Sequence, residues 1–198
     1  MINMYKYNGG WIETITGPMF AGKTEELIRR ITRADIADQN ILVFKPKIDN
    51  RYKNDKIVSH NGNEIKSYVV DNTQDILSFI GKPYNKYDVI AIDEIQFIKG
   101  DNITDLLNTL ANNRIRVITT GLDMDFRGEP FSNMPEVITV SEKVDKLTAI
   151  CNKCGNVATR TQRIVDGEPA SYSDPTVIVG ASESYEARCR KCHEVKGE

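Results

Sequence analysis

Residues 17–24 read Gly17-Pro18-Met19-Phe20-Ala21-Gly22-Lys23-Thr24 and fit the pattern G-x-x-x-x-G-K-[ST] at every position. In this pattern the glycines let backbone N–H groups surround phosphates, the lysine adds a cation beside the β- and γ-phosphates, and the final hydroxyl faces Mg²⁺. A strand is predicted over 11–16 and a helix from 25 to 31, whose N-terminal dipole favours an anion. This context argues against a chance glycine-rich turn, and we expect the loop to bind a nucleoside triphosphate.

The chain beyond this loop alternates between short apolar runs and helical patterns, as an α/β fold does. Strands are predicted over 41–44, 88–93 and 116–120, and helices over 73–80 and 101–110. The first of these helices starts with Thr73 as a cap and stops at Gly81. Short apolar runs are typical of buried parallel strands. We therefore predict a phosphate-loop α/β fold, a parallel sheet flanked by helices, with functional groups at the carboxyl ends of its strands.

Asp93 and Glu94 end one of these apolar strands, in the arrangement known as Walker B. Asp93 is expected to help hold the Mg²⁺ that Thr24 contacts. Glu94 can take a proton from an attacking hydroxyl group or from water. Because side chains alternate along a strand, we expect the two carboxylates to point in different directions. The alternatives are an ordinary turn acid at 93 and a solvated acid at 94.

All four cysteines fall into two C-x-x-C pairs, Cys151 with Cys154 and Cys189 with Cys192. Thiolates at this spacing suit tetrahedral Zn²⁺, whereas disulfides are not expected in a reducing cytosol. Four thiolates leave no open position for water, so the expected zinc is structural. A redox pair or four unrelated thiols are the alternatives. His193 beside Cys192 is a less favoured ligand.

The two pairs are separated by residues 155–188, more than the roughly 15–20 residues of a common zinc ribbon. Strands predicted over 157–163 and 185–188 return to the metal, with turn-forming residues between them. A loop tied at both roots by a metal is either a lid over a ligand or a surface excursion. We expect a nucleotide-binding domain over 1–143 and a small zinc-ribbon-like domain over 144–198, with a lid loop at about 164–180.

Composition limits the partners of this chain of 198 residues. Hydrophobic residues make up 40% and charged residues 27%, which suits a folded, soluble protein. The net charge is −2 and the isoelectric point is near 5.8, so no global positive field attracts nucleic acid. The first residues have no apolar run, and we expect neither a signal peptide nor a membrane segment, hence a cytoplasmic protein.

Several stretches, in one order along the chain, resemble the type II (cytosolic, zinc-containing) thymidine kinase family. They are the phosphate loop, Asp-Glu-Ile-Gln-Phe at 93–97, Gly-Leu-Asp-Met-Asp-Phe-Arg-Gly-Glu-Pro-Phe at 121–131, residues 146–151, residues 179–185 and the paired cysteines. The resemblance implies a transferase for DNA precursor salvage that moves the γ-phosphoryl of ATP to the 5′-hydroxyl of thymidine, with deoxyuridine as a second substrate. It also implies Mg²⁺, inhibition by dTTP and a homotetramer.

The resemblance also implies roles for individual residues. Glu94 matches the general base, Lys23 is the phosphate-loop cation, and Asp49 and Arg51 match a segment that faces the deoxyribose and the reacting phosphate. Side chains that match the walls of the thymine pocket are Met19, Phe97, Leu122, Phe126, Phe131 and Tyr185. Thr161 and the backbone around Ile178 and Val179 match a lid that hydrogen-bonds the base. Residues 162–168 depart from the family pattern in detail.

Two other classes of protein share the separate motifs. A zinc-ribbon phosphate-loop ATPase that acts on nucleic acid could use Asp93 and Glu94 to activate water, but the acidic isoelectric point and the lack of a basic stripe argue against it. A nucleotide-binding regulator would not need Glu94. Release of ADP that depends on thymidine favours the kinase. Stimulation by single-stranded DNA favours the motor, and binding without turnover favours the regulator.

Overall fold

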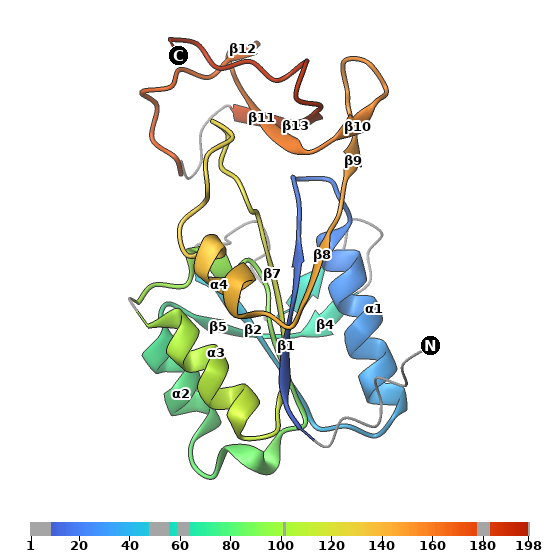
Figure 1. Ribbon diagram of the computed structural model, residues 1–198, viewed down its shortest axis with the longest axis vertical. Helices are drawn as coiled ribbons and strands as arrows, with labels where there is room; N and C mark the ends of the chain where they lie inside the picture. Colours follow the sequence, from blue (N-terminus) through green and yellow to red (C-terminus); the bar gives the residue numbers. More distant parts are fainter. Residues whose placement is uncertain (1–8, 48–55, 59–63, 101, 178–182, 198) are drawn as a thin grey trace.

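A six-stranded sheet lies at the centre of the larger part of the molecule (Figure 1). The computed structural model describes residues 9–47, 56–58, 64–100, 102–177 and 183–197. The strands of the sheet, in spatial order, are β5 (Tyr68–Val70), β2 (Ile41–Pro46), β6 (Val89–Ile92), β7 (Arg116–Gly121), β1 (Trp11–Thr16) and β8 (Lys143–Lys146). Every neighbouring pair is parallel. The predicted α/β class with a parallel sheet is confirmed.

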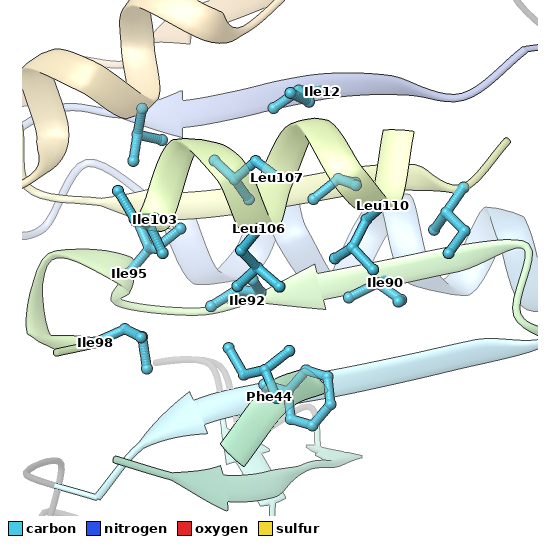
Figure 2. Packing of buried hydrophobic residues seen from close by; sticks show 14 of the residues in the cluster. Ile12, Phe44, Ile90, Ile92, Ile95, Ile98, Ile103, Leu106, Leu107 and Leu110 are labelled. Atoms are coloured by element: carbon cyan, nitrogen blue, oxygen red, sulfur yellow. The ribbon is translucent and has the colours of Figure 1, made fainter. Parts of the chain in front are cut away.

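Helices cover both faces of this sheet. Helix α1 (Lys23–Ile36) lies on one face, and α2 (Thr73–Ile80), α3 (Ile103–Asn112) and α4 (Met134–Val140) lie on the other (Figure 1). The larger apolar cluster lies under α2, α3 and α4 and includes Phe44, Ile90 and Leu107 (Figure 2). Ile12 belongs to this cluster and Ile15 to the one beneath α1, because side chains alternate along β1.

The start of α2 differs from the sequence prediction. Asn72, not Thr73, is the N-cap: its side chain accepts a hydrogen bond from the Asp75 N–H at 2.9 Å, and the Asp75 carboxylate accepts one from the Asn72 N–H at 3.3 Å. This reciprocal capping box satisfies two N–H groups that the first turn leaves open. Thr73 instead donates its hydroxyl to Asn102, the residue before α3, at 2.8 Å. Gly81 ends the helix as predicted.

A buried ionic network joins α1 to the strands beneath it. Glu13 on β1 is 1% exposed and pairs with Arg30 of α1 and Arg116 of β7. Arg30 also binds Glu26 at 2.8 Å and Asp145 of β8 at 2.5 Å. A buried charge is tolerated only when it is paired, so this network makes the position of α1 depend on several strands together.

The C-terminal part lies beyond the carboxyl ends of the large sheet (Figure 1). A small hairpin joins β9 (Ala149–Ile150) to β10 (Val157–Ala158), and β11 (Arg160–Val165) pairs antiparallel with β12 (Glu168–Pro169) and β13 (Glu183–Arg188). A second small hairpin, β3 (Lys56–Val58) with β4 (Glu64–Lys66), lies between β2 and β5 in sequence. None of the helices described is long and apolar enough to cross a membrane.

Candidate active site

The phosphate loop connects β1 directly to α1, and two of its glycines are required by its shape. Gly17 has a φ of 135°, and a Cβ there would lie 2.3 Å from the Leu147 carbonyl oxygen. Gly22 has a φ of 81° and is the N-cap of α1. Both backbones lie in a region that favours glycine. The loop therefore leads into a helix N-terminus whose N–H groups suit an anion.

Lys23 is the first residue of α1 and is 7% exposed. Its ammonium donates a hydrogen bond to the carbonyl oxygen of Pro18 at 2.9 Å, which holds the cation against the loop. Thr24 follows on the same helical turn and is half-buried. Phe20 has a φ of 65° and remains 49% exposed. The loop thus combines the buried ammonium of Lys23 with backbone of positive φ, as expected of a phosphate site.

Asp93 and Glu94 lie at the end of β6, but their directions are not set by strand alternation as the sequence analysis expected. The strand ends at Ile92, and Glu94 adopts a left-handed conformation with φ 48° and ψ 46°. The buried Asp93 accepts hydrogen bonds from the Thr120 hydroxyl and, at 3.1 Å, from the Glu94 N–H. Thr120 also accepts from the same N–H at 3.2 Å. A tight turn braced by β7 therefore orients the two acids.

Gln96 contacts the second acid directly. It lies in a short 3₁₀ turn, η3 (Ile95–Phe97), is 3% exposed, and donates from Nε2 to the Glu94 carboxylate at 2.5 Å. Asn133, just before α4, donates to the carbonyl oxygens of Ile95 and Ile98 at 3.1 and 3.3 Å and supports this turn. No role for Gln96 is predicted from the sequence, where the one signal is a polar residue between the hydrophobic Ile95 and Phe97.

The residues expected to wall the thymine pocket come from several elements at the same end of the sheet. The rings of Phe97, in η3, and Phe131, after β7, meet edge to face with their centroids 5.6 Å apart. Met19 of the phosphate loop donates its N–H to the Thr161 hydroxyl at 3.0 Å. Thr161 is buried on β11, so this bond joins the phosphate loop to the C-terminal part.

The other expected pocket residues lie around the loop after β7. Leu122 follows this strand directly, and Phe126 is 4% exposed. The guanidinium of Arg163 on β11 lies over the Phe126 ring at 5.1 Å. Tyr185 on β13 is the register partner of Arg163. The remaining expected site residues, which lie outside the described part of the chain, are Asp49, Arg51, Ile178 and Val179.

Arg127, for which the sequence predicted no role, holds part of the loop predicted over about 164–180. Its guanidinium donates to the carbonyl oxygens of Tyr172 at 2.8 Å and Asp174 at 2.7 Å, and to the Thr176 hydroxyl at 2.9 Å. It also pairs with Asp125 at 3.2 Å. We call residues 171–177 the lid stem. One side chain from the loop after β7 therefore fixes the path of this stem by three hydrogen bonds.

The four cysteines come together as the sequence predicted. All four sulfur atoms lie within 4.8 Å of one another, and those of Cys154 and Cys189 are 3.7 Å apart. A tetrahedral site with Zn–S bonds of about 2.3 Å has sulfurs about 3.8 Å apart, so the set fits zinc. Burial raises the pKa of Cys151, but hydrogen bonds from backbone groups, that of Cys189 foremost, outweigh it and lower the pKa to about 6. The thiolate form of Cys151 is thereby favoured.

His193 has another role than zinc binding in this arrangement. Its Nε2 lies 2.8 Å from the carbonyl oxygen of Phe126, which can only accept, so this nitrogen donates. The bond joins the zinc module, residues 149–193, to the loop after β7. The phosphate loop also touches this module, because Ala21 packs against an apolar cluster that includes Cys151 and Ala158. The zinc module is thus in contact with two sides of the candidate site.

The family model described as thymidine kinase matches residues 10–193. The match starts one residue before β1 and ends one residue after Cys192, so it covers both the parallel sheet and the cysteine cluster.

Proposed function

The chain belongs to the thymidine kinase family, and from that premise we propose that it transfers the γ-phosphoryl group of ATP to the 5′-hydroxyl of thymidine and of deoxyuridine. The family implies a phosphotransferase. The observation that carries the finer proposal is that the phosphate loop follows β1 and the two acids Asp93 and Glu94 follow β6, so both lie at the carboxyl edge of the sheet with β7 between these strands. Phosphoryl transfer depends mainly on positioning and on electrostatic stabilisation of the transferred group, which such an arrangement can supply.

In this mechanism, different residues of the chain bind the phosphates, hold the metal and accept the proton. The loop amides and Lys23 bind the β- and γ-phosphates, and Thr24 and Asp93 would hold Mg²⁺, which neutralises developing charge when bound. Glu94 accepts the proton of the 5′-hydroxyl as that oxygen attacks. Asp49 and Arg51 are proposed to face the deoxyribose and the reacting phosphate. The turn after β6 supports these roles, because hydrogen bonds from the Glu94 N–H to Asp93 and Thr120 fix the position of Glu94 relative to Asp93.

The thymine base is proposed to bind against the aromatic pair formed by Phe97 of η3 and Phe131 of the loop after β7. The edge-to-face pair of Phe97 and Phe131 offers a rigid apolar wall. A lid over about 164–180, with backbone groups near Ile178 and Val179, would read the base and exclude water from the reacting phosphate. Structural zinc held by the four cysteines would fix this lid to the rest of the molecule.

Replacing Glu94 by Gln tests the mechanism, because Gln keeps the size and removes the proton acceptor. We expect thymidine phosphorylation, measured as thymidine-dependent ADP release, to fall about 10²- to 10⁴-fold. ATP binding should change little, since Lys23, Thr24 and Asp93 remain. A Glu94→Gln enzyme that works at close to the parent rate would place the base elsewhere. Stimulation of the parent by single-stranded DNA, without a thymidine effect, would instead support the nucleic-acid ATPase.

The remaining proposals concern partners. We infer feedback inhibition by dTTP, which would occupy both the phosphate and the thymine subsites, and a cytoplasmic homotetramer that binds neither nucleic acid nor membranes. Competition of dTTP with both ATP and thymidine in steady-state kinetics, together with light scattering of the purified protein, tests the inhibitor and the assembly separately.

A further inference from the structure

We propose that Gln96 is the positioning residue of the catalytic base: its side-chain amide fixes the Glu94 carboxylate so that one oxygen faces the 5′-hydroxyl. The inference rests on the proposed function and adds a residue to it. Gln96 is separated from Glu94 by one residue in a turn that starts left-handed, and its Nε2 donates to Glu94 Oε2 at 2.5 Å.

The direction of this hydrogen bond follows from chemistry. An ionised carboxylate can only accept, and of the two ends of a Gln amide only the nitrogen can donate. The opposite orientation of the amide would place two oxygens against each other. Because an amide does not exchange its proton in such a bond, Gln96 does not take part in proton transfer. Its amide contacts Oε2 of Glu94 and so holds the plane of the carboxylate.

The carbonyl oxygen Oε1 of the Gln96 side chain lies in the space left by the missing side chain of Gly121. A Cβ on Gly121, at the end of β7, would lie 2.5 Å from Gln96 Oε1 and 2.6 Å from the sulfur of Met134. The φ of Gly121 is not in the region that favours glycine, so the reason for a glycine here is space. The missing Cβ gives the carboxamide room to point at Glu94.

Gln96 is also kept at an energetic cost. Its Oε1 is buried and accepts no hydrogen bond from the residues that the structure describes. Burying an acceptor without a partner destabilises the folded state, because its hydrogen bonds to water are lost and not replaced. A methionine of similar length would avoid this cost and fill the same space. A residue that weakens the fold but orients a catalytic group is typical of a functional site.

The test compares kcat for thymidine, KM for ATP and melting temperature in the parent protein and in Gln96→Met. Losing one hydrogen bond to a charged group should lower kcat about 10- to 100-fold. The KM for ATP should not change, and the melting temperature should stay equal or rise. Gln74→Met, the same change on the exposed face of α2, is the matched control and should behave as the parent.

A double-mutant cycle separates positioning from a general structural effect. If Gln96 acts through Glu94, adding Gln96→Met to Glu94→Gln should cause no further loss of kcat, because the group that it orients is already gone. Gly121→Ala supplies a second route, since its Cβ displaces the Gln96 carboxamide and should lower kcat without touching ATP binding.

Either of two kinetic results would overturn the inference while leaving the proposed function intact: a Gln96→Met enzyme with the parent kcat, or losses that multiply in the double variant. A lower melting temperature that accounts for the lost activity would also overturn it, because Gln96 would then be structural. A parent protein that does not phosphorylate thymidine would overturn the proposed function itself, and that result is seen without any variant.

Discussion

Charged residues at the start of α1 show how single side chains connect stability to the site. Glu26 lies one turn after Lys23 and accepts hydrogen bonds from Arg29 at 2.6 Å and from Arg30 at 2.8 Å. The hydrogen bond from Arg29, helped by Arg30, outweighs desolvation and lowers the pKa of Glu26 from 4.5 to about 2. Because Arg30 also holds Glu13 on β1, the charge of Glu26 helps to fix the helix that presents Lys23.

This lowered pKa predicts a pH dependence of stability. A carboxyl with a depressed folded pKa stabilises the fold above its unfolded pKa, and this stabilisation is lost as the pH falls through the folded pKa. Glu26→Gln should therefore lower the free energy of unfolding at pH 7 by at most about 3 kcal/mol. The difference from the parent should shrink between pH 4.5 and about 2. Urea titrations across this range measure it, with Glu136→Gln on the exposed face of α4 as control. A difference independent of pH would contradict the assignment.

At the scale of elements, hydrophobic runs and turn residues predicted most of the sheet. The predicted strand over 11–16 and the predicted helix over 73–80 have the bounds of β1 and α2. The contacts of Arg127 could not be predicted, because its partners come 45 to 49 residues later in the chain. The contacts of Thr120 with Asp93 and Glu94 depend on β7 lying between β6 and β1. That spatial order differs from the order in the chain and has no local pattern. The roles assigned to site residues by resemblance remain predictions.

Arg127 makes three of the hydrogen bonds that hold the lid stem, and the Tyr172 hydroxyl adds another, to Glu129 of the same loop, at 2.6 Å. Arg127→Met keeps a long apolar side chain but removes the three hydrogen bonds to residues 171–177. Because most of the bonds between the lid stem and the loop after β7 are then lost, we expect amide hydrogen exchange in this segment to rise about tenfold, as for local opening. Exchange in β1 and β7 should not change.

Arg33→Met, an exposed change near the end of α1, controls for the loss of an arginine. Mass spectrometry of peptic peptides resolves the lid stem from the sheet. Equal protection of 171–177 in Arg127→Met and in the parent would show that other contacts, such as the bond from Arg163 to the Pro175 carbonyl oxygen, suffice to hold it.

At the scale of the whole molecule, the two parts share the candidate site. The zinc module supplies Thr161, which binds the Met19 N–H, and His193, which binds the Phe126 carbonyl. Ala21 packs against its apolar cluster. The phosphate loop is therefore held partly by residues more than a hundred positions away in sequence, and we expect a zinc ion on the four cysteines to support nucleotide binding through these contacts.

Loss of zinc should therefore affect both parts, though unequally. Cys151→Ser should reduce bound zinc below one ion per chain, measured by elemental analysis, and lower the melting temperature of the zinc module. The parallel sheet should persist in far-UV circular dichroism, because its core does not involve the cysteines. ATP affinity should fall as Met19 and Ala21 lose their support. An active, stable protein without metal would refute a structural zinc.

The contact between Met19 and Thr161 also limits which chimeras of this protein with a foreign zinc ribbon can function. Strand β8 completes the sheet and leads within a few residues into β9, so a foreign zinc ribbon could be grafted after Lys146 without breaking a strand. Such a chimera would bind nucleotide well only if the donor ribbon carried a hydroxyl at the place of Thr161 and small residues opposite Ala21. Domain shuffling is therefore limited to ribbons that preserve this junction, whatever metal ligands they bring.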